Sequence, residues 1–217
     1  MSQSISDFLL SDQLPPRHEI ETICLKADIH SRGIVIHKSP DGPIVAWAKY
    51  GVHVAIAEAL TQDWVARILA ADPTTFVHVP RVFDAFMVPK THFNIGIIIM
   101  EYIALPDCGK KDSELVAKAV QRLHCIKAPS LAPGPVGRGP TVHPFFVDRD
   151  SDITYMTVGE LEEHVNGVSE LHISDTSERV VVLREKLSLF VAKGILTQTS
   201  RMSLTPCWIF SPARNLP

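Results

Sequence analysis

The stretch Ile44-Val45-Ala46-Trp47-Ala48-Lys49-Tyr50-Gly51 is an apolar run that contains a lysine near its end, and it decides the fold class. With the β-branched run 29–37 before it and the turn Ser39-Pro40-Asp41-Gly42 between them, it predicts a β-hairpin. A helix is predicted next, over 54–70, because apolar residues recur there at helical spacing until Asp72-Pro73 ends the pattern. The chain therefore begins as strand, turn, strand and helix.

Two further extended runs follow, over 77–86 and 95–103, and the second is almost wholly aliphatic, as expected for a strand covered on both faces. The remainder of the chain is helical in pattern. Helices are predicted over 113–127, 157–168 and 177–190, with Asp112 or Ser113 capping the first and Thr157 capping the second, three residues before Glu160. Residues 129–144 contain five prolines and three glycines and predict an irregular loop.

Composition excludes several classes of function. The 217 residues are 46% hydrophobic and 21% charged with a net charge of −3, which allows a sizeable core in one domain or two small lobes. No basic stripe is present, so neither a nucleic-acid nor a membrane-surface partner is expected. The first residues lack the pattern of a signal peptide, and no apolar run reaches the roughly 18 residues of a membrane span. We expect a cytoplasmic protein.

Several familiar catalytic and metal-binding motifs are missing from the sequence. The four cysteines are widely spaced, which predicts neither a zinc site nor a disulfide framework. Gly137-Arg138-Gly139 lies in a predicted loop between helices and is not a phosphate-binding loop. Neither His-Glu-x-x-His nor Gly-x-Ser-x-Gly occurs, and His143 before Pro144 is interpreted as a loop or packing residue.

Five short motifs in a fixed order together resemble the aminoglycoside phosphotransferase family of the protein-kinase-like superfamily, in its large fungal branch, and the match as a whole runs from about residue 27 to 168. Each motif is weak by itself, and the order and spacing carry the resemblance. The motifs are Trp47-Ala48-Lys49-Tyr50-Gly51, Ala57-Glu58-Ala59-Leu60-Thr61, Val79-Pro80-Arg81-Val82-Phe83, Ile99-Met100-Glu101-Tyr102-Ile103 and Pro133-Gly134-Pro135-Val136-Gly137.

This resemblance implies an α+β, protein-kinase-like fold of two lobes, with one helix beside an antiparallel sheet in the N-lobe and an incomplete helical C-lobe. The expected divisions are an N-lobe over 1–103, a hinge and partial C-lobe over 104–190, and a divergent, disordered tail over 191–217. The turn at 39–42 has a single glycine, unlike the glycine-rich lid of protein kinases, which favours the aminoglycoside phosphotransferase branch.

The resemblance also assigns an ATP site. Lys49 would meet the phosphates while Glu58 holds its ammonium group. The apolar run from residue 97 to Met100 would form the wall behind adenine, and the extended backbone of Glu101, Tyr102 and Ile103 would offer a carbonyl and an amide to the base edge as a hinge. The alternative is that Lys49 lies on a solvated edge, that Glu58 is an ordinary exposed helix residue, and that 97–103 is a buried strand with a linker. ATP with Mg²⁺ and a small-molecule hydroxyl substrate are the partners that the family implies.

The catalytic aspartate, the asparagine and the metal-binding aspartate of the family are not found where they are expected, after the helix predicted over 177–190. Residues 191–200 read Val-Ala-Lys-Gly-Ile-Leu-Thr-Gln-Thr-Ser, and no acidic residue follows Glu185. One hypothesis is a shift of reading frame or a splicing error near Phe190, because codons for 193–199 read one base earlier can spell an aspartate-containing loop.

Three functions therefore remain open. The chain is an ATP-dependent phosphotransferase by resemblance, a pseudokinase or nucleotide-binding regulatory module without turnover, or a non-functional gene fragment. We predict no catalytic residue and no Mg²⁺ ligand within it. The sequence does not specify the substrate, because the family binds it through the C-lobe. A truncated C-lobe would also leave apolar helix surface exposed, on helices 113–127 and 177–190.

Overall fold

A computed structural model describes residues 14–27, 33–106, 108–143, 146, 151–170 and 209–210. The elements in chain order are α1 (Arg17–Lys26), β1 (Ile34–His37), β2 (Ile44–Gly51), α2 (Ile56–Ala70), β3 (Val77–His78), β4 (Val82–Pro89), β5 (Asn94–Met100), η2 (Lys110–Asp112), α3 (Ser113–His124), α4 (Val158–Glu170) and β6 (Ile209–Phe210). The predicted helix 177–190 and nearly all of the predicted tail lie outside the described residues. The α+β class is confirmed, with four α-helices in the described ranges.

The main sheet has four strands in the order β1-β2-β5-β4, and every neighbouring pair is antiparallel. The predicted hairpin is present, with Ile34 opposite Ala48 in the ladder. β2 is a central strand, because its other neighbour is β5, where Lys49 lies opposite Ile98. A second pairing joins β3 to β6, with Val77 opposite Phe210. Lys49 is therefore not on a sheet edge.

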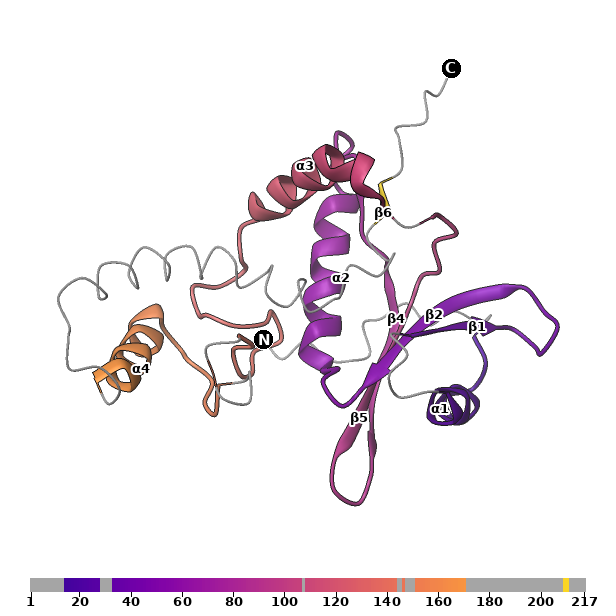
Figure 1. The fold of residues 1–217 in the computed structure, drawn as a ribbon, viewed down its shortest axis with the longest axis horizontal. Coiled ribbons are helices and arrows are strands. Elements are labelled where there is room, and N and C mark those ends of the chain that lie inside the picture. The colour runs from indigo at the N-terminus through magenta and orange to yellow at the C-terminus, as the bar shows by residue number, and fades with distance from the viewer. Residues whose placement is uncertain are drawn as a thin grey trace. The chain divides into compact units, whose positions relative to one another are not determined.

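Helices α1 and α2 cover opposite faces of the main sheet (Figure 1). Successive side chains of a strand point to opposite faces, so β2 divides its residues between the two helices. Ala46, Ala48 and Tyr50 are buried in one cluster with Ile20 and Cys24 of α1. The cluster on the other face contains residues of α2, β4 and β5 and the loop residue Val54, with Trp47 packed against it.

Helix α1 was not predicted from the sequence, which led us to expect a single helix beside the sheet. It begins directly after Pro16, and its buried residues Ile20 and Cys24 are spaced i, i+4 on one face. Arg17 fixes its first turn, since Nε and Nη2 each donate a hydrogen bond of 2.6 Å to the buried carboxylate of Asp84. These bonds raise the pKa of the Arg17 guanidinium, which also lies 5.2 Å from the ring centroid of Phe86.

The two extended runs predicted after α2 have different boundaries in the structure. The extended run 77–86 is divided into β3 and β4, because Pro80 lies between them and has no N–H to donate to a ladder. The run 95–103 ends as a strand at Met100, so residues 101–103 lie outside the sheet. Helix α3 begins at Ser113 as expected, whereas the carboxylate of Asp112 accepts a hydrogen bond of 2.8 Å from Gly109 N–H.

Two compact units divide the chain, and one boundary falls within α3, between Ala119 and Val120. The second unit contains α4 and a small cluster of buried side chains. Tyr155, Leu161 and Val165 pack there with Phe146, and Tyr155 Oη lies 2.8 Å from Nδ1 of His164. Burial raises the pKa of the Tyr155 phenol.

Local hydrogen bonds define the start of α4 and the loop before it. The predicted cap is confirmed, because Glu160 N–H donates to Thr157 Oγ1 over 3.2 Å. Residues 129–143 contain no helix or strand, which agrees with their proline and glycine content. The end of this loop is fixed by two bonds: Ser151 N–H donates to the carbonyl of Thr141 over 3.0 Å, and Thr141 N–H donates to Ser151 Oγ over 2.7 Å.

Candidate functional site

The candidate site lies on the α2 face of the main sheet, where the structure brings Lys49 and Glu58 together. The ammonium of Lys49 donates to Glu58 Oε1 in an ion pair, and the side chains are 21% and 10% exposed. Lys49 is directed to this face by strand alternation, and Glu58 lies in the first turn of α2. Glu58 is therefore not an ordinary exposed helix residue.

Trp47 adds an aromatic surface on the same face. It precedes Lys49 by two residues, so both side chains lie on one side of β2, and it is opposite Met100 in the ladder. Its indole covers Gly33, where an added Cβ would lie 2.5 Å from Nε1. The absence of a side chain at Gly33 therefore leaves room for the indole of Trp47.

The predicted hinge begins where the sheet ends. Glu101 N–H donates to the carbonyl of Arg81 over 2.9 Å, which continues the β4–β5 ladder by one residue. Tyr102 and Ile103 then continue outside the sheet, and the carbonyl of Ile103 accepts from Leu105 N–H. Within the described ranges, no hydrogen bond is found to the carbonyl of Glu101 or the amide of Ile103.

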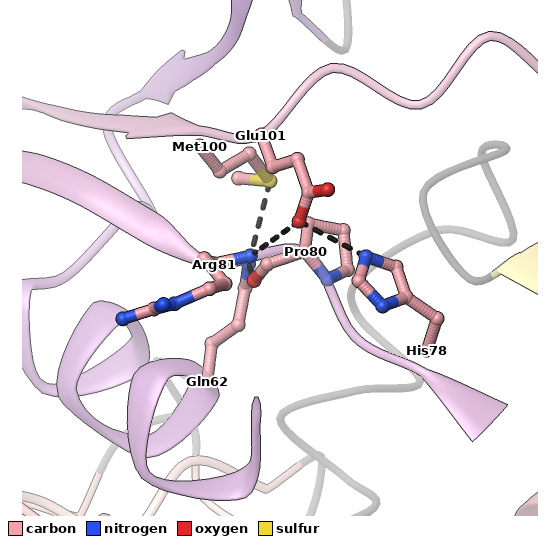
Figure 2. Close-up of polar contacts among 6 residues, drawn as sticks. All are labelled: Gln62, His78, Pro80, Arg81, Met100 and Glu101. Carbon is pink, nitrogen blue, oxygen red and sulfur yellow. Dashed lines mark hydrogen bonds and ion pairs between the residues drawn. The ribbon is translucent and has the colours of Figure 1, made fainter. Parts of the chain in front are cut away.

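The side chain of Glu101 is held by the neighbouring segment (Figure 2). Its Oε2 lies 2.9 Å from Nε2 of His78 and accepts a longer bond, of 3.3 Å, from Arg81 N–H. The carboxylate is thus occupied within the protein. A ligand at the hinge would accordingly meet the backbone of these residues.

Met100 connects the hinge to α2. Its sulfur lies 3.5 Å from Nε2 of Gln62, which also donates a bond of 2.9 Å to the carbonyl of Pro80 (Figure 2). Gln62 and Glu58 are four residues apart and therefore lie on the same side of α2. Gln62 was not predicted from the sequence as a site residue. A polar residue one turn after Glu58, within an apolar helix pattern, was the signal for it.

The predicted site residues therefore form two groups. Lys49 and Glu58 form the ion pair, and Met100, Glu101, Tyr102 and Ile103 form the end of β5 and the extended segment after it. Their assignment to a nucleotide stays a prediction.

Mg²⁺ was expected to accompany ATP. Among the described residues there is no group of three His, Cys, Asp or Glu side chains that could hold a metal ion, so the residues present do not fit such a site. None of the helices in the described ranges combines the length and the apolar character that crossing a membrane requires.

Comparison of the chain with family models, curated proteins and solved structures finds no match. The class that the structure itself defines is an α+β protein with a four-stranded antiparallel sheet. The resemblance to phosphotransferases therefore depends on the motifs in the sequence.

Proposed function

We propose that this chain binds ATP on the α2 face of its sheet, as the nucleotide-binding part of a kinase-like, two-lobed fold. Lys49 neutralises the phosphates and Glu58 holds its ammonium group in place. The base lies against the backbone of residues 101–103. The observation that carries this proposal is the ion pair between a central strand and the first turn of α2.

Physical chemistry supports such a role for the pair. Withdrawing two charged groups from water costs free energy, and a partly buried ion pair adds little net stability. The pair does hold an ammonium group at a fixed position, where it can meet phosphate oxygens through charge-assisted hydrogen bonds. The carbonyl of Glu101 and the amide of Ile103 are an acceptor and a donor that suit the edge of a base.

We propose binding without phosphoryl transfer. Phosphoryl transfer relies on a residue that orients the nucleophile and on metal ions that neutralise developing charge. Residues 191–200, where the resemblance places the catalytic loop, contain neither aspartate nor asparagine. The chain would then act as a pseudokinase or regulatory module in the cytoplasm, descended from an enzyme that phosphorylates a small-molecule hydroxyl.

The test is thermal unfolding of the full chain with ATP and magnesium. A ligand that binds only the folded state at 100 times its Kd stabilises it by about 2.7 kcal/mol, so the wild-type Tm should rise by several degrees in millimolar ATP. Lys49→Met should abolish this rise. No ATP should be consumed during prolonged incubation.

A matched control is Lys118→Met, since Lys118 also forms an ion pair, with Glu114, but on the exposed surface of α3. This variant should keep the full ATP-dependent rise. A wild-type protein whose Tm does not respond to ATP would overturn the proposed site, and a rise retained in Lys49→Met would show that ATP binds elsewhere.

A further inference from the structure

We propose that Gln62 is a positioning residue that couples α2 to the hinge, so that the Lys49–Glu58 pair and the backbone of residues 101–103 respond to a ligand together. This inference rests on the proposed nucleotide site. Its structural basis is the polar cluster in Figure 2, which joins α2, the segment before β4 and the end of β5.

The Gln62 amide is the link on the helix side. Gln62 is 5% exposed, and Nε2 donates to the carbonyl of Pro80 over 2.9 Å while lying 3.5 Å from the sulfur of Met100. A buried amide that loses its partners pays the full cost of its desolvation. A displacement of α2 that broke these contacts would therefore be resisted.

The segment that contains Pro80 and Arg81 is the link on the hinge side. Glu101 is bound to Arg81 twice, since its N–H donates to the Arg81 carbonyl over 2.9 Å and its carboxylate accepts the Arg81 N–H over 3.3 Å. The contact with His78 holds the same carboxylate. A shift of residues 80–81 would thus move the first residue of the hinge.

Glu58 and Gln62 are separated by one turn of a single rigid helix, which completes the connection between the two parts of the site. A ligand that draws Lys49 and Glu58 into one arrangement would favour one position of α2, and through Gln62 one position of the hinge. Such coupling is reciprocal for binding free energies: a base bound at the hinge would strengthen phosphate binding at Lys49 to the same extent.

Gln62→Met tests this coupling, because methionine has a similar volume and no N–H donor. Two ligands are compared by calorimetry: ATP, and inorganic tripolyphosphate, which has phosphates but no base. The Kd for ATP should rise by about tenfold, while the Kd for tripolyphosphate stays within about twofold of wild type. Hydrogen exchange at the Glu101 amide, measured without ligand, should accelerate by about tenfold relative to β2 amides.

Gln121→Met is the matched control, because Gln121 is exposed on α3, and it should change none of these values. Equal weakening of ATP and tripolyphosphate would indicate a merely structural role and overturn the coupling. If the wild type binds neither ligand, the proposed nucleotide site fails. The exchange measurement then decides the coupling alone, and an unchanged rate at Glu101 overturns it.

Discussion

The two faces of the main sheet are stabilised in different ways. The face covered by α1 is an apolar cluster, to which the helix contributes Ile20 and Cys24, and its buried carboxylate, Asp84, is held by Arg17. The other face is covered by α2, which also buries polar side chains. Those are Glu58, Thr61, Gln62 and Asp63.

The two faces therefore differ in what they contribute: the apolar face contributes stability, and the polar face fixes side-chain positions. Burial of apolar surface stabilises a fold without fixing any one side-chain geometry closely, whereas a buried polar group is costly unless every donor and acceptor is paired. The polar groups of α2 do have partners: Lys49 for Glu58, Pro80 for Gln62 and Arg67 for Asp63. Burying these polar groups costs free energy, and their pairing fixes the positions of their side chains. The face covered by α2 is therefore the one on which we expect a ligand.

The largest expected effect is that of Gly96→Ala, which disrupts the packing on the face of the sheet that α2 covers. A Cβ at Gly96 would lie 2.0 Å from the carbonyl oxygen of Val54, a backbone atom that cannot rotate away. The resulting overpacking should cost about 3 kcal/mol in the free energy of unfolding, measured by urea denaturation.

Gly167→Ala is the control for this change. Gly167 lies within α4 with no atom within 4 Å of an added Cβ, so alanine should instead stabilise the protein by about 0.5–1 kcal/mol. A Gly96→Ala protein as stable as wild type would contradict the close contact between Val54 and the sheet.

A smaller effect is expected of Arg17→Met. This substitution tests the ion pair between Arg17 and Asp84, which joins α1 to the face of the sheet that it covers. The substitution leaves Asp84, only 4% exposed, without its cation. The free energy of unfolding should fall by about 2 kcal/mol, less than for a fully buried pair because the arginine side chain is itself half exposed.

The exposed pair of Glu114 with Lys118 provides the comparison for Arg17→Met. Glu114→Gln should leave the urea midpoint unchanged within error, although hydrogen bonding to Lys118 lowers the pKa of Glu114. If both variants lose the same stability, the contact between α1 and the sheet is no stronger than a surface pair.

The smallest expected effect is that of ionising the Cys24 thiol, which is buried in the apolar cluster on the α1 face. This ionisation does not affect the free energy of unfolding at neutral pH. Burial raises the pKa of the thiol from 9.0 to about 11. The stabilising contribution of the neutral thiol is therefore complete below about pH 9 and is lost as the pH rises through 11. When the urea midpoint is plotted against pH, the decrease on the alkaline side should therefore shift in the Cys24→Ala variant.

Thiol labelling with peptide mapping gives an independent measurement. At pH 8 the thiolate fraction of Cys24 is lower than that of an ordinary thiol by about a hundredfold, so its labelling should be slower by at least that factor. The exposed Cys108 and Cys125 are the internal controls. Labelling of Cys24 at their rate would mean that α1 does not cover this face.

Much of the fold could be predicted from local pattern. The hairpin of β1 and β2, helix α2, the aliphatic strand β5 and the cap at Thr157 each follow from spacing or from turn and capping residues. Helix α1 was missed because its apolar stripe consists of only two buried residues, Ile20 and Cys24, which is too short to distinguish a helix from a loop.

The candidate site could be predicted only in part. Lys49 and Glu58 were singled out through a resemblance, and their contact requires that β2 be central and that α2 cover the face to which Lys49 points. Gln62 and His78 could not be identified in this way, because their role depends on which groups lie beside them in the folded chain.

The sequence alone determined the hairpin, helix α2, strand β5 and the cap of α4, since these depend on the spacing of apolar residues and on local hydrogen bonds. The sequence also places Lys49 and Glu58 close to each other in the first half of the chain. Only the tertiary structure decided that they meet, and that Gln62 connects their helix to Met100 and Pro80. Contacts between residues far apart in sequence depend on strand order and on which face a helix covers, and the local pattern of apolar residues specifies neither.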